Sequence, residues 1–352
     1  MADITARKAD HLDLAASGDV GFKQTTTLFE CVRLVHDALP DLSLDAIDLS
    51  TRLFNKKLRA PLLIAGMTGG ADRAKDINRE LASIAEQRGC AFGLGSQRAM
   101  LVRPQTASSY AVRDVAPATL LLGNLGVVQA KSMTTAAIDD LVAAVGADAL
   151  CVHLNPAMEV VQDEGDRDFR GGLDTLGRLA SELKVPVIAK ETGCGISAAV
   201  ARRLRSVGVR HVDVSGAGGT SWVAVETHRA SPARRPLGER FWDWGIPTAA
   251  SVALVAPHGF STVFATGGIS SGLDVAKAIA LGANAAGIAR PILQALTSGG
   301  RAAAVARLDQ IELELRTAML LVGAATVADL RKVPRVVVGE LAEWTRQVGA
   351  QR

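Results

Sequence analysis

The sequence predicts an α/β fold, namely a (β/α)8 TIM barrel with an N-terminal cap and a C-terminal helical extension. From Pro61 onward, eight short apolar runs alternate with segments that have the spacing of amphipathic helices, and this alternation is typical of parallel strands joined by helices. Each run ends in Gly, Ser, Thr, Asn, Lys or Arg. Such residues are expected there, because these barrels place their sites at the carboxyl ends of the strands.

A length of 352 residues suits one large domain or two ordinary ones, and we predict a single domain over the whole chain. We divide it into an N-terminal cap (1–58), a barrel (59–300) and C-terminal helices (301–352). A hydrophobic content of 48% and a charged content of 21% allow a sizeable core and argue against disorder. Aromatic residues make up only 4% and the net charge is only +3. We therefore expect no nucleic-acid partner, because such surfaces need stacking aromatics or strong positive charge.

We expect neither a targeting segment nor a membrane span. Residues 1–13 are polar and charged, unlike the apolar centre of a secretory signal, and no apolar run approaches the roughly 18 residues that cross a bilayer. Four cysteines (Cys31, Cys90, Cys151 and Cys194) show no C-x-x-C spacing. We therefore expect a cytoplasmic protein with reduced thiols, no zinc site and no membrane partner.

The elements follow in order along the chain. Residues 7–11 form the charged head of a short helix, and residues 28–58 contain short alternating pieces that favour an antiparallel cap. Residues 222–247 are an insertion after the sixth strand and a candidate lid, and residues 301–348 add helices after the barrel. The predicted barrel strands are 61–65, 90–94, 119–122, 147–152, 186–189, 211–214, 262–265 and 285–288.

The helix expected after the first strand covers residues 73–88. Its apolar side chains Ile77, Leu81 and Ile84 share one face, which should pack on the barrel. Gly89 stands at its C-terminal stop, because glycine readily adopts the left-handed conformation that ends a helix.

Glycine-rich loops at two strand ends indicate a phosphate-bearing ligand. Gly267-Gly268 follows the seventh strand and Ala289-Arg290 follows the eighth. In this class of barrel these loops bind phosphate through backbone N–H groups at a helix N-terminus, here a helix beginning near Ser271; the alternative is a pair of ordinary tight turns. Residues 216–221 form another glycine-rich loop with two hydroxyls. Together the loops favour a ligand with a phosphate and a large flat ring, such as flavin mononucleotide (FMN).

Lys190 ends the fifth strand, so its amine should lie beside the barrel axis. There it would stabilise negative charge on a reduced flavin, and the alternative is a buried ion pair with Glu191 or Asp213. Cations and donors for a second anion come from Arg7, Lys8, His11, Ser96, Gln97 and Arg98. For Arg7 and Lys8 alone, a solvated surface is the alternative.

A polar stretch, residues 153–167, follows the fourth strand. It contains Glu159 and Glu164, and carboxylate oxygens suit a Mg²⁺ ion that bridges to a diphosphate. The alternative for both residues is a helix-cap or surface position.

Several motifs occur in order along nearly the whole chain: Arg7-Lys8 with His11, then residues 65–70, 95–98, 123–126, 153–155, 164–167, 190–191, 213–222, 244–248 and 267–268. In this combination the sequence resembles the type 2, flavin-dependent isopentenyl-diphosphate isomerases. The implied reaction is a redox-neutral 1,3-proton shift between isopentenyl and dimethylallyl diphosphate, with a small-molecule substrate, Mg²⁺, and FMN kept reduced by NADPH. The resemblance also implies a homo-oligomer, either a tetramer or an octamer.

The resemblance assigns roles residue by residue. The implied FMN contacts are Gly66, Met67, Thr68, Ser96, Asn124, Lys190, Ser215, Thr220, Gly267, Gly268, Ala289 and Arg290. The implied diphosphate contacts are Arg7, Lys8, His11, Ser96, Gln97, Arg98 and Ser197, with Glu159 as the metal ligand. The implied catalytic group is His153, Asn155, Met158 and Lys190.

Two residues depart from the family pattern: Met158 stands where glutamine is usual, and Asp163 where proline is usual. A thioether cannot relay a proton at neutral pH. Either the flavin performs the proton transfers, which we favour, or Gln162 takes the role, or the protein binds FMN and a prenyl diphosphate with altered or lost isomerase activity. A hydroxy-acid oxidase is a further alternative, but the late His-x-Arg pair that it needs is absent near Gly267-Gly268 and beside Arg290.

Overall fold

The computed structural model describes the backbone of residues 4–348 and the side chains of residues 10–348, except those of Ser17 and Asp72. Its barrel strands are β4 (Leu62–Ile64), β5 (Ala91–Gly93), β6 (Leu121–Gly126), β7 (Ala149–Leu154), β8 (Val187–Glu191), β9 (His211–Asp213), β10 (Thr262–Ala265) and β11 (Ala285–Ile288). All eight are parallel to their neighbours and close into a barrel, with β11 paired to β4. The predicted (β/α)8 barrel is therefore confirmed.

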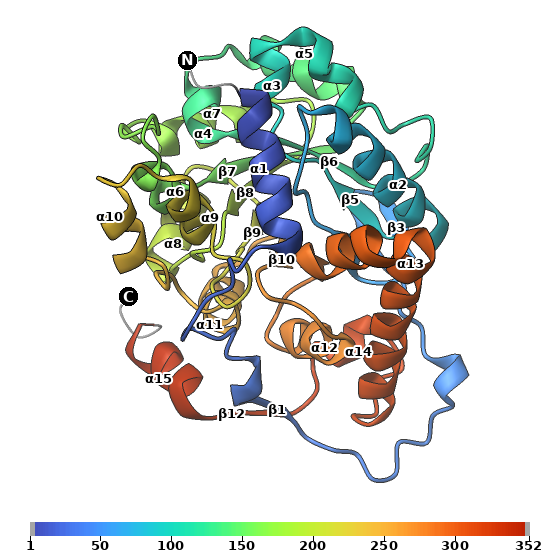
Figure 1. Ribbon diagram of the computed structural model, residues 1–352. Coiled ribbons are helices and arrows are strands. Elements are labelled where there is room, and N and C mark those ends of the chain that lie inside the picture. The colour runs from blue at the N-terminus through green and yellow to red at the C-terminus, as the bar shows by residue number, and fades with distance from the viewer. Residues whose placement is uncertain (1–3, 349–352) are drawn as a thin grey trace.

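Helices follow the strands and form the outer layer (Figure 1). The first, α2 (Asp72–Arg88), ends as predicted at Gly89, which has a φ of 63° and donates to the carbonyls of Ala85 and Glu86. The others up to the eighth strand are α3 (Arg98–Val102), α4 (Val127–Lys131), α5 (Thr135–Val145), α6 (Pro156–Val161), α7 (Gly172–Glu182), α8 (Ala198–Ser206), α9 (Trp222–Arg229), α10 (Arg235–Arg240), α11 (Thr248–Val255) and α12 (Gly272–Ala280).

Strands β6 and β7 run further than the composition predicts. Their ladder continues from Leu122↔Ala149 to Gly126↔His153, so residues expected in a loop belong to the strands. Packing at Gly126 is close, because a Cβ there would lie 2.1 Å from Gln129 Oε1 and the Gln129 side chain would have to move. The longer ladder fixes His153 on the barrel itself rather than on a loop.

The two ends of the barrel are closed by segments from the N-terminal cap. Helix α1 (Ile4–Ser17) crosses the carboxyl end (Figure 1), where Arg290 Nε donates to Ala15 O at 3.0 Å. The hairpin β2 (Thr51–Leu53) and β3 (Lys56–Leu58) closes the other end, because Leu53 and Leu58 pack among the inward-facing side chains of the strands.

The cap contains the antiparallel pairing that we expected, between β2 and β3, but its first strand takes a partner from outside the cap. Strand β1 (Val32–Leu34) pairs antiparallel with β12 (Arg335–Val337) from the C-terminal extension. The extension otherwise contains the helices expected, namely the end of α13 (Arg290–Leu320), which breaks at Gly300, then α14 (Val327–Leu330) and α15 (Gly339–Gln347). Short 3-10 turns are η1 (Phe29–Cys31), η2 (Leu44–Ala46), η3 (Pro104–Ser109) and η4 (Ala256–His258).

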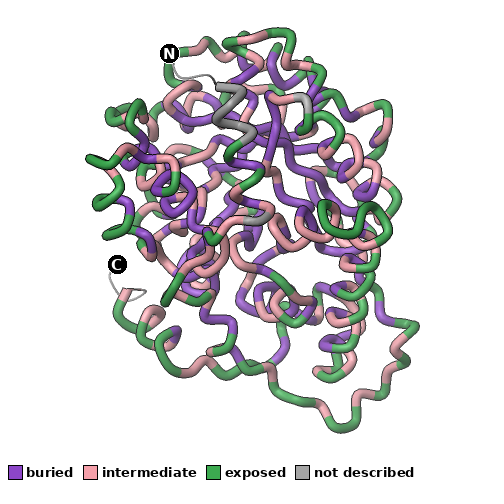
Figure 2. Tube along the Cα trace, in the orientation of Figure 1, coloured by how far each residue is buried: buried purple, intermediate pink, exposed green. Residues whose placement is uncertain are grey.

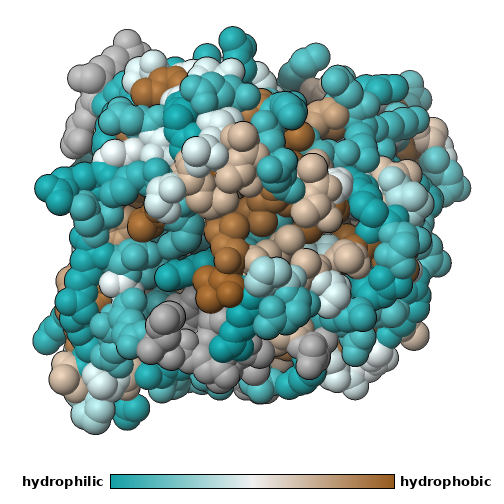
Figure 3. Space-filling model, turned by 90° about the horizontal axis from the view of Figure 1, so that it is seen from above, coloured by the Kyte–Doolittle hydropathy of each residue, from teal (hydrophilic) through white to brown (hydrophobic). Residues whose placement is uncertain are grey.

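Buried residues concentrate in the strands and on the inner faces of the helices (Figure 2). The face drawn in Figure 3 is mostly hydrophilic, with hydrophobic side chains gathered near its middle. Among residues 4–348, no helix has the length and apolar character needed to cross a membrane. All four cysteines are free thiols, as expected.

Candidate functional site

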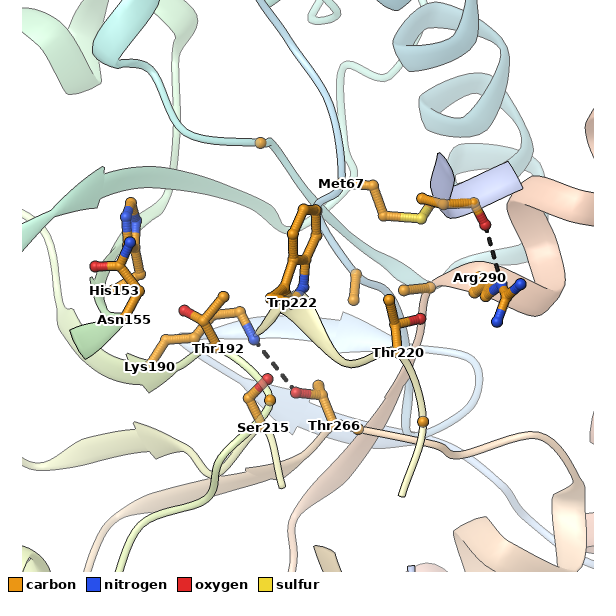
Figure 4. Close-up of a pocket in the computed structure, with 18 of the residues that line it drawn as sticks. Met67, His153, Asn155, Lys190, Thr192, Ser215, Thr220, Trp222, Thr266 and Arg290 are labelled. Carbon is orange, nitrogen blue, oxygen red and sulfur yellow. Dashed lines mark hydrogen bonds between the residues drawn. The ribbon is translucent and has the colours of Figure 1, made fainter. Parts of the chain in front are cut away.

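A cavity of about 420 Å³ lies at the carboxyl ends of the strands, beneath α1. Figure 4 shows His153 and Asn155 on one side of it and Thr220 and Arg290 on the other, with Lys190 and Trp222 between them. Most residues proposed from the sequence contribute to its wall: His11, Gly66, Met67, Ser96, Arg98, Asn124, His153, Asn155, Met158, Glu159, Lys190, Ser215, Thr220, Gly267, Gly268, Ala289 and Arg290.

Three expected contact residues are not part of this wall, and their roles stay predictions. Gln97 is fully buried, accepts from the Asn124 N–H at 2.9 Å and donates to Leu141 O at 3.2 Å. Ser197 caps helix α8 by accepting from the Val200 N–H at 3.2 Å. Thr68 is buried, and its hydroxyl has no partner among the described residues. The side chains of Arg7 and Lys8 fall outside the described residues.

The cavity also includes residues to which the sequence assigned no role. Thr192 and Thr266 directly follow strands β8 and β10, and Gln129 and Gln294 lie within the first five residues of α4 and α13. Their common signal is position, since each is a polar residue within six positions of a strand end. The Thr192 hydroxyl is buried and has no partner among the described residues, so it is available to a ligand.

Lys190 is held in a buried ion pair that also faces the cavity. Its Nζ lies 2.7 Å from Asp213 Oδ2 and 3.3 Å from Thr266 Oγ1, and Thr266 donates to Asp213 Oδ1 at 2.6 Å (Figure 4 shows the contact with Thr266). The side chain of Asp213 is only 2% exposed. Burial raises the pKa of the neighbouring Cys151 thiol to about 12. Lys190 is therefore an oriented cation at the cavity floor, and Cys151 stays a neutral thiol beside it.

Of the two helix N-termini near the expected phosphate site, those of α12 and α13, only that of α13 is open to an anion. At α12, Ser271 and Asp274 form a capping box, and Glu314 accepts from the Gly272 N–H at 2.7 Å. Two carboxylates thus occupy that helix end, which excludes an anion. At α13 the N-cap residue Ala289 has no side-chain cap, and among the described residues the N–H groups of Gly268 and Ile269 have no partner. The anion-binding corner therefore lies between Gly268 and the start of α13.

His153 is oriented by Asn124. Asn124 Nδ2 donates to Leu94 O at 3.2 Å, so its Oδ1 faces His153 Nδ1, 2.8 Å away. Since that oxygen only accepts, the hydrogen-bond network assigns the proton to Nδ1. In the neutral ring, Nε2 is then the acceptor.

The side of the cavity formed by α6 presents a buried carboxylate. Glu159 Oε1 accepts from Asn155 Nδ2 at 2.8 Å, and Oε2 accepts from the Asp166 N–H at 2.9 Å. Each oxygen retains a lone pair. Among the described residues, no group of three or more His, Cys, Asp or Glu side chains could hold a metal. Met158 lies beside Asn155, with its sulfur 3.8 Å from Asn155 Nδ2.

Helix α9 joins α1 above the cavity. His11 Nε2 lies 2.7 Å from Glu226 Oε1, and Glu226 Oε2 accepts from Arg229 at 2.9 Å. The Trp222 ring packs edge-on at 5.5 Å from the His11 ring. The residues after α9 are also tied to the loop that follows α6, because Ser231 donates to Asp163 through both its N–H and its hydroxyl. These two hydrogen bonds lower the pKa of Asp163. Asp163, which stands where the family usually has proline, therefore serves as a carboxylate that anchors the segment after α9.

Comparisons with known proteins point to a flavin-dependent family, in agreement with the cavity described above. The sequence profile of the FMN-dependent dehydrogenases matches residues 2–170 and 152–335. An isopentenyl-diphosphate delta-isomerase of Methanothermobacter thermautotrophicus is 45% identical over 347 residues (98% of this chain and 97% of that protein). A second, from a Synechococcus strain, is 51% identical and covers 84% of this chain and 85% of its own length.

Solved structures support the fold. A lactate oxidase of Pediococcus acidilactici has a TM-score of 0.68 with 15% identity, over 95% of this chain and 93% of its own. A mandelate oxidase mutant has a TM-score of 0.64 with 18% identity, over 93% of this chain and 95% of its own. At these identities the likeness extends to the barrel and not to the chemistry of the site.

Proposed function

The chain belongs to the FMN-dependent dehydrogenase family, within it to the isopentenyl-diphosphate delta-isomerases, and on this premise we propose that it interconverts isopentenyl and dimethylallyl diphosphate. The observation that carries the proposal is the arrangement of the cavity. An anion corner at Gly268 and α13, the cation of Lys190, and a second polar wall with Arg98, His153 and Glu159 face one space. This arrangement suits a flavin phosphate, a flavin ring and a separate diphosphate.

The described residues fit FMN. The unpartnered N–H groups at Gly268 and Ile269 would hold its phosphate. The Thr192 hydroxyl, which has no partner among the described residues, would face its ring together with the amine of the Lys190–Asp213 ion pair. When bound in its reduced form, FMN supplies an acid/base group next to the alkene, with NADPH as the proposed reductant. The ion pair with Asp213 fixes the position of the Lys190 amine, so it would stabilise negative charge on the ring without reorganisation.

The opposite wall would bind and orient the substrate. Arg98 supplies a guanidinium for the diphosphate, and His153, whose Nδ1 is held by Asn124, lines the same wall. Glu159 is one buried carboxylate with lone pairs to spare, which fits a Mg²⁺ ion that takes its other ligands from substrate and water. Helix α1, closed over the cavity by the His11–Glu226 contact, excludes bulk water from the reacting carbons.

Proton exchange with solvent tests the proposal directly. Incubation of FMN-loaded protein with isopentenyl diphosphate, Mg²⁺ and NADPH in D₂O is expected to give dimethylallyl diphosphate that contains deuterium, detected by mass spectrometry and NMR. If the protein retains FMN, seen by its yellow colour, and binds the diphosphate but gives no product, the proposal is contradicted. That result would support the alternative that Met158 marks a protein that binds FMN and a prenyl diphosphate without isomerising it.

Replacing Met158 with glutamine is expected to increase turnover by up to about tenfold, because an added amide near Asn155 can hydrogen-bond where a thioether cannot. The measurement is kcat for isopentenyl diphosphate, with Met158→Leu as the apolar control of similar volume. If Met158→Leu and wild type are equally active, the sulfur itself has no role. A loss of activity in Met158→Gln would show that this cavity is adapted to an apolar residue.

Replacing Glu159 with glutamine is expected to weaken dependence on Mg²⁺, since the amide keeps the shape but removes the hard anionic ligand. Turnover at saturating substrate should fall by about 100-fold or more, whereas bound flavin, followed by its absorbance, should be unchanged. An unaltered Mg²⁺ titration would contradict the assignment of Glu159 as the metal ligand.

We also propose a cytoplasmic homo-oligomer, on the basis of the family resemblance alone. Sedimentation of the FMN-loaded protein would test for a tetramer or octamer.

A further inference from the structure

The loop after α6 connects two groups on the cavity wall. Asp166 lies in this loop, and its backbone N–H donates to Glu159 Oε2 at 2.9 Å. Its side chain accepts from Gln129 Nε2 at 3.0 Å and lies 3.9 Å from a guanidinium nitrogen of Arg98. One residue thus contacts segments that follow β5, β6 and β7. Asp166 does not itself line the cavity, whereas Glu159, Arg98 and Gln129 do.

The backbone of this loop is folded tightly against α6. Gly165 donates to Gln162 O at 3.4 Å, and a Cβ on Gly165 would lie 1.9 Å from Glu159 O. The chain therefore reverses directly over the end of the helix and brings the Asp166 N–H to the Glu159 carboxylate. The hydrogen bond from Gln129 then fixes the loop from the other side.

These contacts add little to the stability of the fold. The side chains of Arg98 and Asp166 are 33% and 32% exposed, and an ion pair between partly exposed groups contributes little to stability. These contacts instead determine how the Glu159 carboxylate and the Arg98 guanidinium are oriented. Groups that hydrogen-bond to a metal ligand typically change metal affinity by about 10- to 100-fold when they are removed.

We propose that Asp166 is a positioning residue that couples the metal-binding carboxylate of Glu159 to the anion-binding guanidinium of Arg98. This inference rests on the proposed function, because it takes Glu159 as a Mg²⁺ ligand and Arg98 as a diphosphate contact. The backbone of Asp166 orients the carboxylate, and its side chain orients the cation. A metal–diphosphate unit therefore meets both groups in a preformed arrangement.

The experiment uses Mn²⁺ as a paramagnetic substitute for Mg²⁺, with inorganic pyrophosphate and FMN-loaded protein. Asp166→Ala removes the anchor to Gln129, so the apparent Mn²⁺ affinity, measured by electron paramagnetic resonance, should fall about 10- to 100-fold. Asp166→Asn keeps an acceptor for Gln129 and the backbone N–H, so it should retain Mn²⁺ affinity within about threefold. In both variants the KM for isopentenyl diphosphate should rise more than kcat falls, because the charge that orients Arg98 is lost.

Two further variants sharpen the test. Gln129→Met removes the anchoring donor and should reproduce the Mn²⁺ effect of Asp166→Ala. Asp168→Asn is the matched control, because Asp168 lies two residues away and pairs locally with Arg170 at 2.8 Å; it should leave Mn²⁺ affinity and KM unchanged.

The inference is overturned if Asp166→Ala leaves both the Mn²⁺ affinity and the KM at the wild-type values. It is also overturned if Asp166→Asn loses as much Mn²⁺ affinity as Asp166→Ala, since the anchor to Gln129 would then be irrelevant. Mn²⁺ and pyrophosphate binding require no turnover. Wild-type protein that shows the expected Mn²⁺ pattern without isomerising its substrate would therefore contradict the proposed function and still support the role of Asp166.

Discussion

Replacing Lys190 with methionine is expected to reduce turnover of isopentenyl diphosphate by about 100- to 1,000-fold, the range seen when one preorganised electrostatic donor is removed. The amine is fixed by Asp213 at 2.7 Å and Thr266 at 3.3 Å, and methionine has a similar length without the charge. The measurements are kcat and the reduction potential of the bound flavin, which should become more negative as the nearby cation is lost.

Removal of Lys190 alone leaves the Asp213 carboxylate buried without its cation, which typically destabilises a protein by about 3–5 kcal/mol. The double variant Lys190→Met with Asp213→Asn removes both charges and is the control for folding. We expect it to recover thermal stability without recovering turnover. If the double variant regains activity, the cation has no role in catalysis and Lys190 serves only the ion pair.

Gly268→Ala is expected to abolish retention of FMN during purification and to lower the melting temperature. Gly268 has a φ of +72°, and a Cβ would lie 2.4 Å from Thr27 Cγ2 and 2.8 Å from Gly218 O. The left-handed conformation costs an alanine about 1–2 kcal/mol, and the contacts add about 1–3 kcal/mol of overpacking. The loop can relieve this only by moving the N–H groups of the anion corner. Flavin content and FMN titration of the apoprotein measure the result.

The matched control is Gly259→Ala. Gly259 has nearly the same φ, +71°, but a Cβ there meets nothing within 4 Å. Gly259→Ala should therefore lose only about 1–2 kcal/mol of stability and keep its flavin. Equal loss of flavin in both variants would mean that backbone strain, and not the packing around Gly268, disrupts the site.

Short apolar runs in the sequence predict the barrel because they show that each strand is buried on both faces. An apolar run such as Thr262 to Ala265 is buried throughout, as a strand of a parallel barrel must be, and the polar residue after it faces the cavity. The ends of β6 were harder to predict, because Gly123 to Gly126 has the composition of a loop. The pairing of Gly126 with His153 extends the strand, and pairing depends on a partner distant in sequence.

Two neighbouring residues of one sequence motif take different places in the fold, again because contacts distant in sequence decide where each side chain lies. Gln97 and Arg98 are adjacent, yet Arg98 lines the cavity while Gln97 is fully buried against β6 and α5. The turn into α3 sets their directions, and composition does not encode it. The phosphate corner is a second case: both α12 and α13 follow glycine or small residues, but only the folded chain brings Glu314 to the Gly272 N–H and closes the first helix end.

The sequence by itself determined the fold class, the strand ends that form the site and most of the residues in its wall, because burial and strand-end position are local properties. The tertiary structure alone decided which of those side chains have partners. His11 meets Glu226 across 215 residues, and Asp213, Thr266 and Lys190 meet from three strands or their ends. Such contacts set charge and orientation, and they depend on distances that no local pattern contains.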